Sequence, residues 1–184
     1  SLAEGAFGLS SGLIYPPGVF SHTEEMIELC RPVAAAGGLY ATHMRNEGTW
    51  LVESVEETIR VGRETGVSVE ISHHKAAGQS NWGKVKRSLD RMLDASAQGM
   101  SIHCDVYPYI ASSTVLGAVL PPWVQEGGVE KLLQRLADSG CRHRIKTEFT
   151  AGLPGWDRFA TGDNWDRIVI ASCSRAVRIR LYAA

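Results

Sequence analysis

The segment Val67-Ser-Val-Glu-Ile-Ser-His-His74 is a short apolar stretch that ends in two histidines. Three other segments have the same character: Gly8-Leu-Ser-Ser-Gly-Leu-Ile-Tyr15, Gly38-Leu-Tyr-Ala-Thr-His-Met-Arg45 and Met100-Ser-Ile-His-Cys-Asp-Val-Tyr107. A polar residue near each end, Ser11, His43, His73 and Asp105, follows the previous one after 32, 30 and 32 residues. A strand, a helix and two loops occupy about this length, so the spacing predicts consecutive βα units.

Helical patterns fill the intervals between the expected strands. Each begins at a residue that can cap a helix and ends at a glycine. They extend from Ser21 to Gly37, from Thr49 to Gly66 and from Asn81 to Gly99. Strands that alternate with helices of this length indicate a parallel sheet.

Two architectures satisfy this pattern, an open doubly wound sheet and a β/α barrel. The barrel is favoured because each strand carries its reactive side chains at the carboxyl end, where barrel active sites are built. An open sheet would concentrate them at one switch point. A complete barrel has eight units in about 250 residues. We therefore expect an α/β fold, a partial (β/α)8 barrel of roughly four units in residues 1–171, and a divergent tail in residues 172–184.

The pattern is weaker after Tyr109. Val129 to Asp138 has the apolar spacing of an amphipathic helix. Gly140 to Gly155 is expected to form a loop with a short helix, and Trp165 to Ala171 one more strand.

The composition is that of a globular protein, and it excludes several classes of function. Of the 184 residues 44% are apolar and 21% charged, and the formal net charge is −1. A nucleic-acid or membrane-surface partner would favour a clustered basic excess, so neither is expected. Apolar runs stay well below the roughly 20 residues that span a bilayer. The chain opens with Ser1 and carries no signal-peptide pattern, so we expect an internal piece of a longer protein.

The four cysteines, Cys30, Cys104, Cys141 and Cys173, lie far apart and include no Cys-x-x-Cys pair. A chain of this size and apolar content does not need disulfides to fold. Reduced thiols and a cytoplasmic location are therefore expected.

His43 and His73 are the most informative pair of residues. They end consecutive strands, and neighbouring strands lie about 4.8 Å apart. Two imidazoles at these positions can share one metal ion, so the matched spacing slightly favours a metal site over two separate strand-end histidines. Residues His73 and His74 point to opposite sides of a strand, and chemistry alone leaves open which of them is the ligand.

Other polar residues follow the same strand ends. Lys75 can hold a substrate carboxylate as a point charge, although the spacing alone favours a solvated lysine. Arg45 is expected to pair with Glu47. In Asp105-Val-Tyr-Pro-Tyr109, a phenol can bind a developing oxyanion or can simply pack under a loop.

Together, four motifs resemble the N-acyl-D-amino-acid deacylases (D-aminoacylases) of the amidohydrolase superfamily. They are Gly8-Leu-Ser-Ser-Gly-Leu-Ile-Tyr-Pro-Pro-Gly18, Tyr40-Ala-Thr-His-Met-Arg-Asn-Glu47, Ile71-Ser-His-His-Lys75 and Asp105-Val-Tyr-Pro-Tyr109. The resemblance runs from about Ala6 to Ile170. It implies a zinc-dependent barrel enzyme that cleaves the amide bond of small N-acyl-D-amino acids.

The resemblance also implies a role for individual residues. His43 and His73 correspond to zinc ligands, and the family pattern tolerates variation where His74 stands. Lys75, Tyr107 and Ser113 correspond to residues that hold the substrate carboxylate and the reacting carbonyl. Tyr15 corresponds to a tyrosine that lines the pocket.

The chain departs from the family pattern at three points. The family's first-strand His-x-His, its metal-bridging cysteine and its catalytic aspartate have no match, and Asp105 is not that general base. Two alternatives therefore remain: a cyclic-amide hydrolase of the hydantoinase or dihydroorotase kind, and an inactive truncated family member. Side-chain preference and oligomeric state are not indicated by the sequence.

Overall fold

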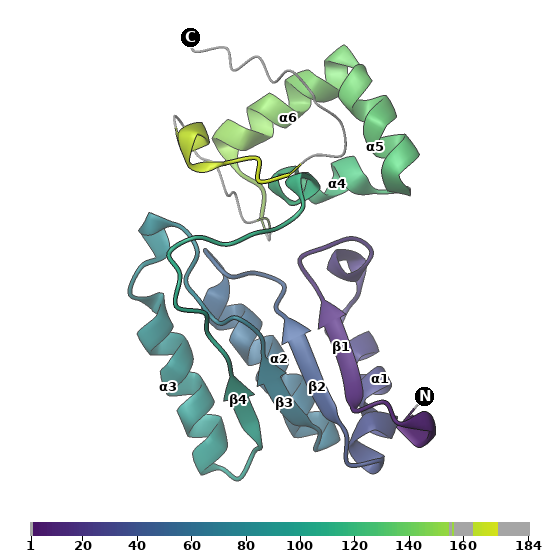
Figure 1. Ribbon diagram of the computed structural model, residues 1–184, viewed down its shortest axis with the longest axis vertical. Helices are drawn as coiled ribbons and strands as arrows, with labels where there is room; N and C mark the ends of the chain where they lie inside the picture. Colours follow the sequence, from purple (N-terminus) through teal and green to yellow (C-terminus); the bar gives the residue numbers. More distant parts are fainter. Residues whose placement is uncertain (1, 155, 157–163, 173–184) are drawn as a thin grey trace.

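A parallel four-stranded sheet forms the base of the molecule in the computed structural model, which describes residues 2–154, 156 and 164–172 (Figure 1). The strands are β1 (Gly8–Gly12), β2 (Leu39–His43), β3 (Ser68–Ile71) and β4 (Ile102–Cys104). They lie side by side in the order of the sequence, β1-β2-β3-β4. The predicted strands and their parallel pairing are confirmed.

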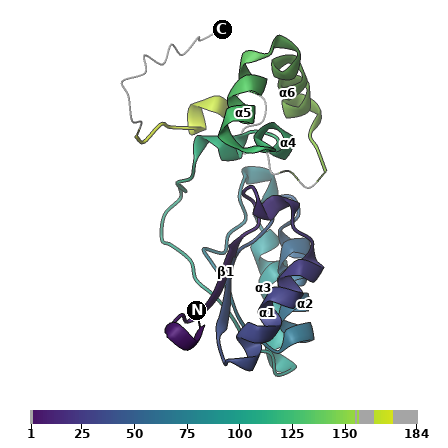
Figure 2. The same cartoon turned by 90° about the vertical axis from the view of Figure 1, so that its right-hand side faces the viewer.

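Three α-helices connect the strands: α1 (Thr23–Ala35), α2 (Leu51–Thr65) and α3 (Lys84–Ala97). All three lie on the same face of the sheet (Figure 2). A doubly wound sheet carries helices on both faces, whereas a barrel carries them only on the outside. The one-sided arrangement identifies the four strands and three helices as a partial (β/α)8 barrel, as predicted.

Alternate strand residues face the helices and form the core. Tyr40, Val69 and Ile71 are buried there against Val55 and Ile59 of α2. Burial of an apolar side chain of this size contributes about 1.5–3 kcal/mol. The residues between them face the other side of the sheet, so these strands have two chemically different faces.

Helix α2 lies very close to the sheet because it presents Gly62 to β3. A Cβ atom at Gly62 would lie 3.0 Å from Cγ2 of Val69 and 2.0 Å from Cε of Met100. Gly66, the predicted end of this helix, adopts a left-handed conformation with φ 76° and accordingly closes it.

The prediction of the capping residues is wrong for all three helices. Each helix begins two or three residues after its predicted cap, which was Ser21 for α1, Thr49 for α2 and Asn81 for α3. Two of the three side chains instead stabilise the preceding turns. The Ser21 hydroxyl donates to the carbonyl of Gly18 at 2.6 Å, and the Asn81 amide donates to the carbonyl of Ala77 at 2.7 Å.

The helices α4 (Pro122–Gln125), α5 (Gly128–Ala137) and α6 (Ser139–Ala151) lie beyond the carboxyl ends of the strands (Figure 1). Helix α5 confirms the helix predicted there. The loop with a short helix predicted from Gly140 is wrong in the length of the helix, because α6 extends over 13 residues. Asp138 caps this helix by accepting from Cys141 N at 2.7 Å.

The strand predicted from Trp165 to Ala171 is also wrong. Residues Asn164–Arg167 form a short 3-10 helix, and the Trp165 ring packs against Phe149 of α6 with centroids 5.1 Å apart. Its apolar side chain therefore serves helix packing rather than a sheet. The tail predicted for residues 172–184 lies outside the described residues except for Ser172.

The remaining regular segments are 3-10 turns, at Leu2–Glu4, Gly18–Phe20, Gln79–Asn81 and Leu116–Val119. None of the helices in the described part of the chain combines the length and apolarity that crossing a membrane requires. Cys30, Cys104 and Cys141 are free thiols. Burial raises the pKa of Cys30 to about 11, so this thiol is protonated and unreactive.

Candidate metal centre

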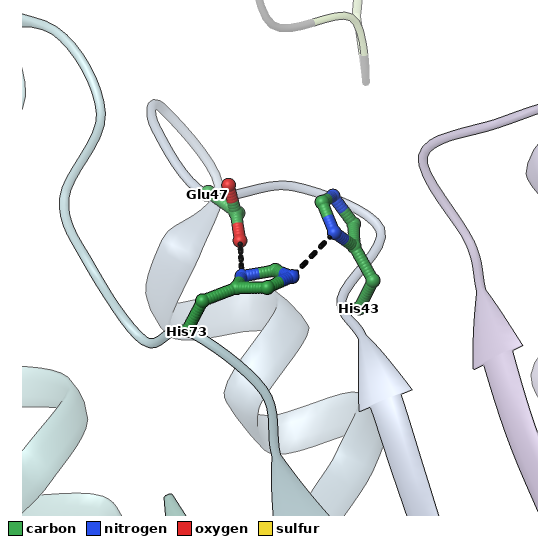
Figure 3. A group of neighbouring side chains, drawn as sticks. All are labelled: His43, Glu47 and His73. Carbon is green, nitrogen blue, oxygen red and sulfur yellow. Dashed lines mark hydrogen bonds and ion pairs between the residues drawn. The ribbon is translucent and has the colours of Figure 1, made fainter. Parts of the chain in front are cut away.

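Strands β2 and β3 bring two histidines together at their carboxyl ends. His43 is the last residue of β2, and His73 follows β3, which pairs with β2 through Thr42 and Ile71. Nδ1 of His43 lies 2.7 Å from Nε2 of His73 (Figure 3). The predicted proximity of the two imidazoles is confirmed.

The backbone of His73 is held in an uncommon conformation. Its φ of 42° is the only positive value among the described non-glycine residues, and such a conformation costs on the order of 1–3 kcal/mol. Asp105 offsets this cost from the neighbouring strand end. Its Oδ1 accepts from His73 N at 2.6 Å, and its carbonyl accepts from His74 N at 2.9 Å.

His74 points away from this cluster, as expected. Its side chain is buried, and Nε2 lies 2.9 Å from the Ser88 hydroxyl of α3. Burial lowers the pKa of His74, and the Lys75 charge lowers it further. A neutral imidazole that bonds to a helix residue serves packing between strand and helix.

Glu47 is the residue of the site that sequence analysis missed. Its buried carboxylate Oε1 lies 2.8 Å from Nδ1 of His73 (Figure 3). The same oxygen lies 2.6 Å from Nζ of Lys75. The predicted Arg45–Glu47 pair is wrong, because Arg45 binds Glu57 of α2 at 2.9 Å. The available signal was the position of Glu47, in the same strand-end motif as His43.

The residues predicted to bind substrate line one pocket with the histidines. Tyr15, Lys75, Tyr107 and Ser113 surround a cavity of about 100 Å³ beside His43. The Tyr15 ring lies 4.9 Å from the His43 ring, and its hydroxyl is 2.8 Å from that of Thr114.

Lys75 and Tyr107 are neighbours in this pocket, with Lys75 Nζ 5.5 Å from the centre of the Tyr107 ring. Burial and then the Glu47 charge raise the pKa of Tyr107, while Ser112 opposes the shift. The buried Tyr107 hydroxyl makes no hydrogen bond of normal geometry to another described residue. It is therefore a protonated donor available to a ligand in the pocket.

His43 has the properties that a metal ligand requires. Burial, His73 and Lys75 lower the pKa of His43 to about 4, so its imidazole is neutral at pH 7. Its Nε2 atom is buried and without a hydrogen-bonding partner among the described residues. A buried polar atom of this kind is costly unless something binds it. The imidazole nitrogens of His43 and His73 suit zinc, and the Glu47 carboxylate lies within 4.8 Å of their ligand atoms.

No family model matches the chain. Individual proteins of known function are nevertheless similar to it in sequence and in structure. D-aminoacylase of Alcaligenes xylosoxydans xylosoxydans is 49% identical over 116 residues, which are 63% of this chain and 24% of that protein. The N-acyl-D-glutamate deacylase of Bordetella bronchiseptica, solved with zinc and a phosphonate inhibitor, is 37% identical with a TM-score of 0.60. That match covers 67% of this chain and 25% of the other.

A D-aminoacylase structure that addresses the role of a binuclear metal centre is also similar. It is 38% identical with a TM-score of 0.61, over 79% of this chain and 33% of that one. The chain thus spans about a quarter to a third of the length of these relatives.

The one-sided βα units and the histidine pair at their carboxyl ends define a segment of an amidohydrolase barrel. More specifically, the matched stretch is similar to D-aminoacylase and to the N-acyl-D-aspartate and N-acyl-D-glutamate deacylases. The resemblance inferred from the four motifs is confirmed.

Proposed function

We propose that this chain supplies the zinc-binding and carboxylate-binding part of a cytoplasmic hydrolase that cleaves small N-acyl-D-amino acids to a carboxylate and a free D-amino acid. One observation carries the proposal. The nitrogens of His43 and His73 lie 2.7 Å apart at adjacent strand ends, with Lys75 beside them. The named activities and the zinc of the relatives support it.

His43 and His73 hold the zinc ion in this proposal. Bound zinc supplies an activated water at neutral pH and polarises the amide carbonyl. The chain's own contribution is to present two imidazoles from adjacent strand ends. Asp105 adds to this arrangement because it fixes the backbone of His73.

The pocket residues bind the substrate. Lys75 offers an ammonium group to the α-carboxylate as a point charge. Tyr107 donates its unpaired hydroxyl to the carbonyl oxygen, where negative charge develops during hydrolysis. Ser113 and Tyr15 complete the wall around the acyl-amino acid.

The general base is not among these residues. Asp105 is occupied with the backbone of His73, and no aspartate in the described part of the chain lines the pocket. Two histidines also leave zinc short of the three protein ligands typical of catalytic sites. We therefore expect little activity from the isolated chain.

The test uses a full-length relative that carries the same residues. Substitution equivalent to Lys75→Ala should raise KM for N-acetyl-D-methionine, with a much smaller effect on an analogue that has no carboxylate. An equal effect on both substrates would remove Lys75 from the binding site. Turnover of hydantoin or dihydroorotate in preference to the linear amide would favour the cyclic-amide alternative.

A further inference from the structure

Both ring nitrogens of His73 have a polar partner, and the two partners lie on opposite sides of the ring. Nε2 faces His43 at 2.7 Å, and Nδ1 faces Glu47 at 2.8 Å (Figure 3). A neutral imidazole has one N–H and one lone pair, and the partner of one nitrogen decides which nitrogen carries the proton. A carboxylate can only accept, so Glu47 places the proton on Nδ1 and leaves the lone pair of Nε2 toward His43.

A competing donor stands at the same nitrogen. Nζ of Lys75 lies 2.9 Å from Nδ1 of His73, close enough to donate a hydrogen bond to it. That bond would require the opposite tautomer, with the proton on Nε2, where it would block metal binding. Glu47 prevents this because its Oε1 accepts from Lys75 at 2.6 Å, while the His73 carbonyl accepts from Lys75 at 2.7 Å.

We propose that Glu47 is a positioning residue that sets the tautomer of His73 against the competing donor Lys75 and thereby couples the metal-binding and carboxylate-binding groups of the site. The inference rests on the proposed function for its metal, but the tautomer itself is a property of the zinc-free chain. Glu47 acts through His73 and does not share an ion with it, because it bonds the nitrogen that faces away from His43.

The burial of Glu47 makes this role energetically significant. Its side chain is only 5% exposed, so its interaction with the two donors is weakly screened by solvent. Carboxylates that orient a metal-binding histidine in this way typically change metal affinity by about 10–100-fold. We expect an effect of this size in the present chain.

The experiment uses the 184-residue chain and the variants Glu47→Gln, Glu47→Leu and Glu47→Leu/Lys75→Met. Zinc affinity is measured by competition with a chelating dye, and the tautomer of His73 by long-range ¹H–¹⁵N NMR of the zinc-free chain. Glu57→Leu is the matched control, since it removes a carboxylate 14% exposed that pairs with Arg45 outside the pocket.

The expected result has three parts. Glu47→Leu moves the His73 proton to Nε2 and weakens zinc binding about 10–100-fold. The milder Glu47→Gln weakens it less, and the double variant recovers part of the loss because the competing donor is gone. Glu57→Leu retains the parental tautomer and affinity.

An unchanged tautomer in Glu47→Leu overturns the inference, as does a double variant that binds zinc no better than the single one. If Glu47→Leu does not fold, the tautomer and affinity of Glu47→Gln decide the question. A parent chain that binds no zinc contradicts the proposed function instead, and the tautomer measurement still tests Glu47.

Discussion

The two faces of the sheet have opposite compositions although they belong to the same strands. The covered face carries Tyr40, Val69 and Ile71, all buried under α1–α3. The open face carries Ser10, Glu70 and His103, none of which is buried. The covered face therefore contributes most of the core and of the stability. The open face contributes little to the core, and the metal centre lies at the carboxyl ends of its strands.

His73 and His74 show this division between adjacent residues. His74 is buried and bonds Ser88 of a helix, whereas His73 bonds His43 and Glu47 at the mouth. The same side chain therefore serves packing at one position and metal chemistry at the next. Substitutions on the two faces should separate stability from zinc affinity.

The largest stability effect is expected on the covered face. Ile71→Ala should lower the free energy of unfolding by about 2–5 kcal/mol, because the Ile71 side chain is fully buried and its removal leaves a cavity in the core. Urea denaturation followed by circular dichroism measures the change. Glu70→Ala, next to it on the open face, should change the same quantity by less than about 0.5 kcal/mol. A comparable loss of unfolding free energy in both variants would contradict the different roles of the two faces.

His74→Ala should cost about 1–3 kcal/mol of stability because the buried hydrogen bond between His74 and the Ser88 hydroxyl is lost, while Ser88 keeps only its bond to the Val85 carbonyl. Its zinc affinity should stay within about twofold of the parent, since His74 does not contact the cluster. His73→Ala provides the comparison, with lost zinc binding and a smaller change in stability. If the His74 variant folds normally but no longer binds zinc, then His74 rather than His73 is the zinc ligand.

Asp105→Asn should weaken zinc binding measurably, by a few-fold and at most about tenfold, since Asp105 holds the backbone of His73 rather than its ring. Isothermal titration calorimetry measures the affinity. Glu70→Gln is the control, because Glu70 is another carboxylate of the open face without a bond to His73. An Asp105 variant with parental affinity would show that the strained backbone of His73 holds its shape unaided.

The smallest effect concerns pH. Burial raises the pKa of Glu70, and the nearby Asp105 charge adds to the shift. The ionised carboxylate is therefore less favourable in the folded chain than in the unfolded one. Glu70→Gln should accordingly increase stability at pH 7 by less than about 0.5 kcal/mol and should not increase it below the ordinary glutamate pKa. Urea titrations at the two pH values test this, and a gain only at low pH would contradict the sign.

Sequence alone predicts the sheet and the histidine pair because both follow from a repeated pattern. Each βα unit has an apolar strand and polar residues at its carboxyl end, so the spacing of His43 and His73 already places them together. Glu47 was missed because its partners, His73 and Lys75, lie in the next unit. Contacts between units depend on loop geometry that local periodicity does not specify.

The region after Tyr109 was predicted less well for a related reason. Helix α6 contains few apolar residues in a regular stripe, and only Ile145 within it is buried, so the sequence pattern resembles a loop. Trp165 likewise packs on Phe149 of this helix, which a strand-like run of apolar residues does not reveal. The divergent tail and the boundaries proposed for residues 1–171 remain predictions.

The central claim is that His43 and His73 together bind one zinc ion. Calorimetric titration of the purified chain with zinc tests it most directly, with His43→Ala, His73→Ala and His74→Ala measured alongside. We expect one zinc per chain for the parent and His74→Ala, and no site-specific binding for the other two variants. Parental zinc binding in either His43→Ala or His73→Ala would contradict it.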